Sequence, residues 1–487
     1  MAGSPEIQKQ IEHFLEKQGP QLSTSLINFL VSNYSIPGDT ARKRLSRLKF
    51  PITKIKGLFS GNQAFYHLQH QYKKPEFYDA LIAAFDSSGK QYYAIVQAIE
   101  FHYGYIKKEQ IAAYSASPVD KLRGHKKIDN IINKLIELGV LYEESDYYKL
   151  NPFISIKENF NHFKAVETAK NFVLIQFNDW ARNIGLVSYN TGTFYSQFGK
   201  FAWSFVSPSY VTTLTRFNNS NIVQGFVIAD ILIGNRIDLK TIQFFIQKID
   251  VVKTLRGLSN FLPFLIIDEI EIETLKYLKG KGIILGFVDQ LFGSEYKELL
   301  KSLINTVTNA GAILKKNPQA YLNLIEKLDK LVGGKTNNLR GDLFELAVGY
   351  YHSNFCQSLD IGKLINYEGQ IREIDVFATY ADKLVVAECK GYKNRIGKSQ
   401  LEDWISNKIL IIRKWILQQN LYSNKKIVFE FWSSGGFTDD AKEFIKNIKT
   451  RKYELVFIDE KGLIEKSRDI PSKKFKDILR QYYLKEI

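Results

Sequence analysis

The pattern of apolar and polar positions differs between the two ends of the chain. Towards the N-terminus, short stretches carry apolar residues three and four positions apart, a spacing that predicts amphipathic helices. Towards the C-terminus, apolar runs of β-forming residues such as LVVAEC alternate with amphipathic stretches. We therefore expect a multidomain protein of the α+β and α/β classes. Its 487 residues favour several domains at about 150 residues each.

The first 75 residues predict three helices followed by a β-hairpin. The third helix lies in TARKRLSRL, after Pro37-Gly38-Asp39, and the hairpin surrounds Ser60-Gly61-Asn62. This order resembles a winged helix-turn-helix, in which the third helix contacts DNA. A small helical domain with a charged outer face is the alternative.

The predicted third helix is strongly basic. Its apolar positions Ala41, Leu45 and Leu48 are spaced by four and three, so they share one face. The opposite face is then free to contact DNA phosphates. The predicted DNA-binding residues are Arg42, Lys43, Arg44 and Arg47.

Residues 76–155 repeat the order of helices and hairpin. The stretches QYYAIVQAIEFHYGY and KKEQIAAYS precede HKKIDNIINKLIELGVL, and GVLYEESDYYKL predicts a second hairpin. The block therefore resembles a second winged helix, although its less basic helix favours packing or protein contact. The apolar residues at helical spacing are Ile128, Ile131, Ile132, Leu135 and Leu138.

The net positive charge of the chain favours a negatively charged binding partner. Lys and Arg number 67 against 51 Asp and Glu, a formal charge of +16, which favours nucleic acid or an anionic membrane. The chain has neither an apolar run long enough to span a bilayer nor an N-terminal signal pattern, so nucleic acid is preferred. Its two cysteines, Cys356 and Cys389, fit a reducing compartment. We expect a cytoplasmic protein; a merely solvated basic surface is the alternative.

A pair of predicted strands brings two carboxylates together. IREIDVFATY and KLVVAECKGY are separated by Ala381-Asp382, which predicts a two-residue hairpin loop. Asp375 then lies opposite Glu388, with Cβ atoms about 4.5–5.5 Å apart. Two carboxylates so close repel each other unless a cation lies between them. Lys390 shares the face of Glu388, because side chains two apart on a strand point the same way.

Such a set of residues suits phosphodiester hydrolysis. Carboxylate oxygens are hard ligands for Mg²⁺, which acidifies a bound water and stabilises phosphate charge. Lys390 can orient or deprotonate the attacking water. Glu345, on the preceding amphipathic helix RGDLFELAVGYYHSNF, adds a carboxylate. The predicted ligands of Mg²⁺, with Mn²⁺ as a substitute, are Asp375, Glu388 and Glu345.

These residues resemble the PD-(D/E)XK nuclease superfamily, in particular its restriction-endonuclease, Mrr-like and Holliday-junction-resolvase branches. The resemblance runs over Glu345, Arg372-Glu373-Ile374-Asp375 and Glu388-Cys389-Lys390. It implies an α-β-β-β-α-β order, and Ile374 stands where the family often has Pro. A surface hairpin with chance charges is the alternative. The catalytic residues that the resemblance implies are Asp375, Glu388, Lys390, Glu345 and Gln400.

Residues 156–308 contain a weaker version of the same pattern. FVIADILIGNRIDLKTIQFF and VVAECKGYKNRIGKSQLEDW both predict an apolar strand, a loop with Asn-Arg-Ile and a helix. Their alignment matches Asp230 with Glu388 and Leu232 with Lys390, and the preceding strands offer no equivalent of Asp375. We therefore expect a nuclease-like fold that has lost its metal site; an unrelated α/β domain is the alternative.

The most consistent function is a Mg²⁺-dependent endonuclease that cuts double-stranded DNA, in restriction or anti-phage defence. A recombination or repair nuclease on branched DNA and a non-enzymatic DNA-binding regulator are alternatives. RNA stays open as a substrate, and a homo-oligomer as an assembly state. The expected domains are a winged helix-turn-helix over 1–75, a second winged-helix-like domain over 76–155, a degenerate restriction-endonuclease-like α/β domain over 156–308, a helical linker over 309–337 that includes Gly333-Gly334, and a restriction-endonuclease-like α/β/α nuclease domain over 338–487.

Overall fold

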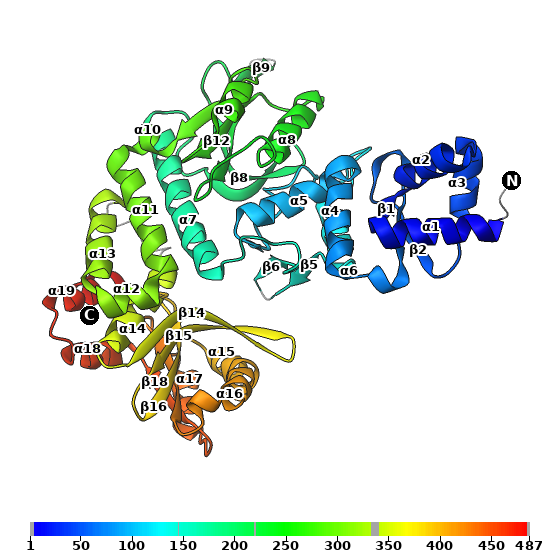
Figure 1. Cartoon of the computed structure of the whole chain (residues 1–487). Helices are drawn as coiled ribbons and strands as arrows, with labels where there is room; N and C mark the ends of the chain where they lie inside the picture. The colour runs from blue at the N-terminus through cyan, green and yellow to red at the C-terminus, as the bar shows by residue number, and fades with distance from the viewer. Residues whose placement is uncertain (1–3, 145, 219–220, 333–339, 485–487) are drawn as a thin grey trace. The chain divides into compact units, whose positions relative to one another are not determined.

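A computed structural model describes residues 4–144, 146–218, 221–332 and 340–484 (Figure 1). The chain forms two compact units. The first contains Met1–Asn159 and Ala181–Gly286, and the second contains Phe160–Trp180 and Phe287–Ile487. Both combine helices with sheets, so the predicted mixed α/β multidomain architecture is confirmed. The five finer domain boundaries stay predictions, and Gly333-Gly334 lies outside the described residues.

The N-terminal part of the first unit has the predicted order of three helices and a hairpin. Its strands form an antiparallel sheet in the order β1-β3-β2. Apolar side chains of all three helices and of the hairpin share one core. The elements are α1 (Ser4–Gln18), β1 (Gln21–Leu22), α2 (Ser23–Tyr34), α3 (Gly38–Ser46), β2 (Ile52–Ile55) and β3 (Phe65–Leu68).

The next part repeats a helix and a hairpin, with one difference from the prediction. All five apolar residues at helical spacing between Ile128 and Leu138 are buried. Residues 108–114 form turns rather than a helix. The strands pair in the order β4-β6-β5. The elements are α4 (Pro75–Ser88), α5 (Lys90–Phe101), β4 (Tyr105–Lys107), α6 (Ile128–Glu137), β5 (Leu141–Glu143) and β6 (Tyr147–Leu150).

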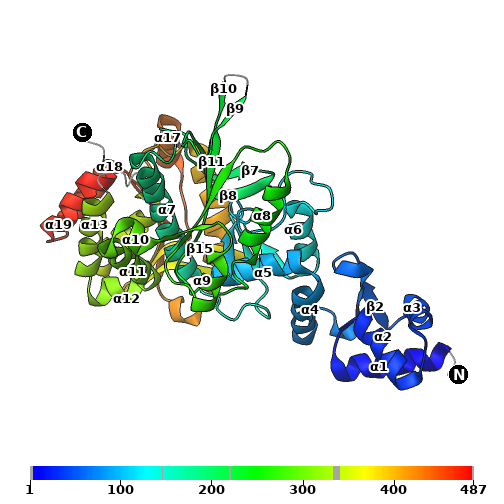
Figure 2. The ribbon, with the colours of Figure 1, turned by 90° about the horizontal axis from the view of Figure 1, so that it is seen from above.

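A five-stranded sheet completes the first unit, in the order β13-β12-β11-β8-β7. Figure 2 shows the short β9–β10 pair projecting from it as a narrow hairpin. The elements are α7 (Phe160–Asn183), β7 (Thr193–Phe198), β8 (Phe201–Ser209), β9 (Arg216–Asn218), β10 (Asn221–Val223), β11 (Gly225–Leu232), α8 (Gln243–Thr254), β12 (Phe261–Ile267), α9 (Ile272–Lys279) and β13 (Ile284–Phe287). The part of α7 up to Trp180 belongs to the second unit.

The second unit is built on a five-stranded sheet in the order β14-β15-β16-β17-β18. Its strands and following helices are α14 (Arg340–Ser353), β14 (Ser358–Tyr367), β15 (Gln370–Thr379), β16 (Lys383–Lys390), α15 (Lys398–Asp403), the π-helical segment η4 (Trp404–Ile409), α16 (Leu410–Leu417), β17 (Lys426–Ser433), α17 (Asp439–Asn447), β18 (Glu454–Ile458), α18 (Glu460–Arg468) and α19 (Lys473–Ile478). Four helices precede them: α10 (Val288–Phe292), α11 (Ser294–Thr308), α12 (Ala310–Lys316) and α13 (Gln319–Val332).

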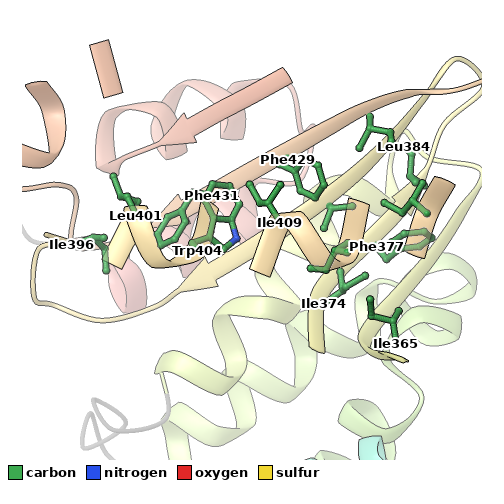
Figure 3. Packing of buried hydrophobic residues seen from close by; sticks show 14 of the residues in the cluster. Ile365, Ile374, Phe377, Leu384, Ile396, Leu401, Trp404, Ile409, Phe429 and Phe431 are labelled. Carbon is green, nitrogen blue, oxygen red and sulfur yellow. The ribbon is translucent and has the colours of Figure 1, made fainter. Parts of the chain in front are cut away.

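Apolar side chains hold one face of this sheet against the helices that follow β16 and β17. Trp404 and Ile409 of η4 pack with residues of β15 and β17, among them Phe377 and Phe429 (Figure 3). The cluster is buried throughout, with Phe429 fully inaccessible. The strands that carry Asp375, Glu388 and Lys390 are therefore packed against a buried apolar core.

The two central strands of this sheet form the predicted hairpin. Val376 pairs with Ala387 and Thr379 with Leu384. The Tyr380 backbone N–H donates to the carbonyl of Lys383 at 2.8 Å, which closes the two-residue loop. Continuing this register places Asp375 opposite Glu388, as the sequence predicts.

The two five-stranded sheets share a strand order and pairing directions. In each, the first two strand pairs are antiparallel and the next is parallel. The Asn-Arg-Ile loops also match, because Ile237 bridges Ile270 and Ile396 bridges Phe437, both in parallel. Aligning FVIADIL with LVVAECK thus matches β11 with β16 in topology.

Candidate functional site

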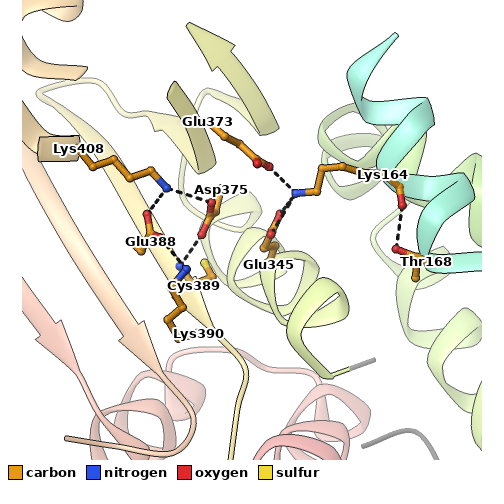
Figure 4. Close-up of polar contacts among 9 residues, drawn as sticks. All are labelled: Lys164, Thr168, Glu345, Glu373, Asp375, Glu388, Cys389, Lys390 and Lys408. Carbon is orange, nitrogen blue, oxygen red and sulfur yellow. Dashed lines mark hydrogen bonds and ion pairs between the residues drawn. The ribbon is translucent and has the colours of Figure 1, made fainter. Parts of the chain in front are cut away.

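Three of the predicted residues meet where the middle of β15 lies beside the C-terminal end of β16 (Figure 4). Asp375 and Glu388 are buried, with 6% and 7% of their surfaces exposed. Lys390 Nζ lies 2.8 Å from Glu388 Oε1. The Cys389 backbone N–H donates to Asp375 Oδ2 at 2.8 Å, and the Cys389 thiol is buried as expected. The hairpin thus fixes both carboxylates.

A lysine from the following helical segment lies between the two carboxylates. Lys408 Nζ, on η4, is 2.5 Å from Glu388 Oε2 and 3.7 Å from Asp375 Oδ1. The sequence predicts that a cation must separate this pair. Lys408 supplies one from the chain itself, and sequence reasoning missed it.

A second ion cluster adjoins the first. Lys164, on the part of α7 that belongs to the second unit, donates to both oxygens of Glu345 at 2.9 and 3.1 Å. The same Nζ lies 2.5 Å from Glu373 Oε1. Glu345 comes from α14, as predicted, and Glu373 precedes Asp375 by two positions on β15. Four carboxylates and three lysines therefore form two adjoining ion-pair groups, with oxygens of Asp375, Glu345 and Glu373 within 4.8 Å of one another (Figure 4).

A glycine of β14 adjoins this cluster. Gly362 has a φ of +63°, a conformation that L-residues rarely adopt. A Cβ there would lie 2.9 Å from Asn161 Oδ1, which is too close, whereas 3.7 Å from Lys164 Nζ is ordinary contact. The backbone conformation and the Asn161 side chain therefore both favour glycine at this position.

Burial and ion pairing set the protonation of these groups. Burial raises the pKa of Glu345 to about 8, although Lys164 opposes the shift. Burial disfavours the charged form of Asp375, but the combined attraction of Lys408, Lys390 and Lys164, with the hydrogen bond from the Cys389 N–H, lowers the pKa of Asp375. The pKa values of Lys390 and Lys408 are raised despite burial, chiefly by Glu388. Both lysines therefore stay protonated at neutral pH.

The carboxylates fit a divalent cation. One oxygen each from Glu345, Glu373 and Asp375 lies within 4.8 Å of the others. Buried carboxylate oxygens are the donors that Mg²⁺ uses in proteins. The group found among the described residues contains Glu373, which was not predicted as a ligand, in addition to Glu345 and Asp375. Glu388 faces Asp375 across Lys408.

The fifth predicted catalytic residue lies apart from these contacts. Gln400 is exposed at the start of α15, where its Oε1 accepts the Gly397 backbone N–H at 3.1 Å. In the structure this side chain caps a helix. A catalytic role for Gln400 stays a prediction.

The sheet of the first unit carries a different group at the equivalent place. The β8–β11 register continues to set Ser204 opposite Asp230. Asp230 Oδ1 accepts from the Ser204 backbone N–H at 2.9 Å, and its Oδ2 lies 2.5 Å from Lys248 Nζ of α8. Lys248 also donates to the carbonyl of Ala113 at 2.6 Å, and both side chains of the pair are fully buried. The pair is thus an internal structural contact.

The predicted DNA-binding helix has the expected faces. Ala41 and Leu45 are buried, and Leu48 packs against the same core. Lys43 and Arg42 are exposed on α3, Arg44 is half-buried, and Arg47 is exposed directly after the helix end. Arg42 also forms an ion pair with Asp39, with Arg42 Nη1 2.9 Å from Asp39 Oδ1. The most accessible cations are therefore Lys43 and Arg47.

Replacing Lys164 with Met is expected to lower the free energy of unfolding in metal-free buffer by about 2 kcal/mol or more. The reason is that Glu345 and Glu373 then lack their cation in a largely buried site. Added Mg²⁺ should raise the Tm of this variant more than that of the wild type, which thermal denaturation with and without Mg²⁺ measures.

The control is Lys363→Met, which breaks a comparable but more exposed pair with Asp360 on the same sheet. It should show the Mg²⁺ response of the wild type. Equal Mg²⁺ responses in all three proteins would contradict the sharing of these carboxylates between Lys164 and a metal ion.

Comparisons with known proteins add little to this geometry. No family model matches the chain, and no curated protein matches it. Two solved structures are similar at a TM-score of 0.17 each. Protein VC1899 from Vibrio cholerae is 9% identical and the match covers 45% of this chain and 50% of that one. The restriction endonuclease FokI bound to DNA is 12% identical, with 59% and 65% covered. The chain thus matches less than two thirds of either protein, and likeness at this level carries no argument about function.

Proposed function

We propose that the second unit is a Mg²⁺-dependent nuclease that hydrolyses phosphodiester bonds in DNA. The observation that carries this proposal is the juxtaposition of Asp375, Glu388 and Lys390 on paired strands, with Glu345 and Glu373 beside them. An acidic pair with a neighbouring lysine is the arrangement that the resemblance to PD-(D/E)XK nucleases leads us to expect, and it supports the proposal.

The residues have separable tasks in this proposal. Asp375, Glu345 and Glu373 would hold the metal ion, with Glu388 next to Asp375. When bound, the ion supplies acidity to a coordinated water and positive charge for the phosphate. Lys390, held by Glu388, is a charged donor beside the carboxylates and orients the attacking water or a phosphate oxygen. The backbone N–H of Cys389 keeps Asp375 in place.

Support for DNA as the substrate comes from the rest of the chain. The helix order, hairpin and basic α3 of the first unit fit a winged helix-turn-helix. The formal charge of +16 favours a polyanion. We further propose a restriction or anti-phage defence role, which rests on analogy between architectures. Repair of branched DNA is the alternative role, and the full acidic cluster with its lysines disfavours a purely regulatory protein.

The test is incubation of the purified chain with methylated and unmethylated supercoiled plasmid, with Mg²⁺, with Mn²⁺ and with EDTA. Nicked or linear DNA is expected only where a divalent cation is present. Parallel incubation with duplex RNA shows whether the protein cleaves DNA, RNA or both. Absence of cleavage of every substrate, with folded protein and either cation, would count against the proposal.

Replacing Lys43 and Arg47 with Ala is expected to weaken duplex binding and to flatten its salt dependence. Each lost phosphate contact should reduce the slope of log K against log salt by about 0.9. Fluorescence anisotropy over a salt series, in EDTA, measures this change. Stability should hardly change, because both side chains are exposed.

The matched control for this pair removes two exposed lysines of α1, Lys9 and Lys17, and so changes the net charge equally. It should bind with nearly the slope of the wild type. A Lys43/Arg47 variant that keeps the affinity and slope of the wild type would show that α3 does not contact DNA.

A further inference from the structure

A groove runs along the edge strand of the catalytic sheet, away from the carboxylate cluster. It lies between α16 and the C-terminal part of α17, over the first residues of β17 and most of β18, and has a volume of about 990 Å³. β18 is the last strand of the sheet order, so its outer edge is unpaired there. The charged side chains that line the groove are Arg413, Lys425, Lys426, Arg451, Lys452 and Glu454.

Not all of these cations are free. Lys425 Nζ donates to the carbonyls of Tyr380 and Ala381 at 2.5 and 2.8 Å, and so holds the hairpin loop. Lys426 is paired with Glu454 at 2.6 Å. Lys425 and Lys426, two of the five cations, therefore have structural roles within the sheet.

The other three have no such explanation. Arg413 Nε is buried and has no hydrogen-bond partner among the described residues. Its guanidinium lies near Tyr453, where it counteracts the rise in the pKa of that phenol caused by burial. Arg451 and Lys452 are exposed, and within the described part of the chain neither forms an ion pair. A buried donor without a partner normally costs stability, so a ligand that accepts from it is expected.

The groove is separate from the catalytic cluster. Along β18 the groove reaches Phe457, which the register sets level with Phe431 and Glu388, but β17 lies between β18 and β16. The groove residues of β17, Lys426 and Ile427, lie at the opposite end of the parallel strands from Lys390. Lys426 is level with Lys383, seven residues before Lys390, or roughly 23 Å at about 3.3 Å each. None of the residues that line the groove is one of the four carboxylates or three lysines of the cluster.

We propose that this groove binds the sugar-phosphate backbone of a nucleic acid as a second contact of the nuclease unit. Phosphate oxygens accept hydrogen bonds from guanidinium groups, and both Arg413 and Arg451 line the groove. The lining also includes Tyr453 and apolar residues such as Ile427. Proteins that bind nucleic-acid strands combine cationic residues for the backbone with aromatic side chains in the same way. The inference rests on the proposal that nucleic acid is the substrate, but it does not require cleavage.

The test measures equilibrium binding of a fluorescein-labelled DNA duplex to the full chain in EDTA, over a series of salt concentrations. The variant carries Arg413→Gln, Arg451→Gln and Lys452→Gln. We expect its affinity at low salt to fall at least about tenfold and its salt slope to decrease by about two to three, at about 0.9 for each phosphate contact. Single-stranded DNA of the same length, measured in parallel, shows which form of the backbone the groove prefers.

The control variant carries Lys301→Gln, Lys327→Gln and Lys461→Gln, three exposed lysines of the same unit outside the groove. It changes the net charge equally and should bind within about twofold of the wild type. Equal losses in both variants would overturn the groove proposal in favour of a general charge effect. Should the triple variant not fold, Lys452→Glu alone, at an exposed position, is expected to weaken binding, and unchanged binding would overturn the proposal.

The outcomes separate this proposal from the proposed function. If the groove variant binds DNA as tightly as the wild type, the groove proposal is wrong, but the proposed nuclease function is unaffected. A groove variant that binds DNA normally but loses an acidic-peptide or self-association contact assigns the groove to protein instead. Absence of any duplex or single-strand binding by the wild type overturns both.

Discussion

Replacing Asp375 with Asn is expected to reduce Mg²⁺-dependent plasmid cleavage by about three orders of magnitude or more, because one buried ligand charge is lost from the cluster. A loss of this size corresponds to about 4 kcal/mol in the transition state. The Asn side chain keeps the shape of Asp375, and its carbonyl can still accept the Cys389 N–H. Initial rates of nicking, measured by gel with equal amounts of folded protein, give the result.

DNA binding in EDTA should stay within a fewfold of the wild type, since Asp375 is buried. Asp382→Asn is the matched control, because Asp382 is exposed in the loop of the same hairpin. It should cleave like the wild type. An Asp375→Asn protein that still cleaves at a tenth of the wild-type rate would remove Asp375 from the proposed site.

Replacing Asp230 with Ala should produce a loss of stability without a loss of catalysis. Lys248 would remain fully buried without its counter-charge, and breaking a buried pair in this way costs about 3–5 kcal/mol. Urea denaturation monitored by tryptophan fluorescence suits this test, because Lys248 Nζ lies 4.0 Å from the ring centre of Trp203. Cleavage per folded molecule should equal that of the wild type, since Leu232 occupies the place of Lys390.

The double variant Asp230→Leu with Lys248→Met provides the control. Removing both charges together should recover most of the lost stability, because apolar residues of similar volume replace a buried ion pair at little cost. A single variant that is fully stable but cleaves a hundredfold more slowly would mean that the first-unit sheet takes part in catalysis.

The core of the site could be predicted because local rules fix it. A two-residue loop at Ala381-Asp382 determines which residues of β15 and β16 oppose each other, and the alternation of a strand determines their face. Glu373 obeys the same alternation, two positions before Asp375, so its place beside Glu345 was available from the sequence. The resemblance includes Glu373 but implies a ligand role only for Asp375 in this segment, so Glu373 was not predicted as a ligand.

The two lysines that complete the site follow from tertiary packing. Lys164 is 181 positions before Glu345, and no local pattern links α7 to α14. Lys408 belongs to a helix whose sequence predicts only an amphipathic element against the sheet. Its charge reaches Glu388 because that helix crosses the end of β16. Long-range contacts of this kind decide the electrostatics of the cluster and are invisible to periodicity.

The strand order of the first-unit sheet was accessible for a different reason. The shared Asn-Arg-Ile loop and the apolar strand before it aligned β11 with β16, and the pairing directions then agree. The sequence predicts that this place has lost its metal site and the equivalent of Lys390, but it does not predict the lysine partner that Asp230 has in Lys248. That partner comes from the helix rather than from the strand, so comparing the strands could not reveal it.

The π-helical segment η4 explains why the helix after β16 needs one residue more than α8, the helix after β11, to bring its lysine to the sheet. Lys248 follows Ile237 by eleven positions, whereas Lys408 follows Ile396 by twelve, yet each lysine reaches the acidic residue of its central strand. A single π-helical turn accommodates one extra residue without rotating the rest of the helix. Trp404, Ile409 and Ile412 thereby all remain in the core. The π-helical turn is what the insertion of a single residue into an α-helix would produce. Deleting one residue from Trp404–Ile409 would give eleven positions between Ile396 and the lysine, the same separation as between Ile237 and Lys248.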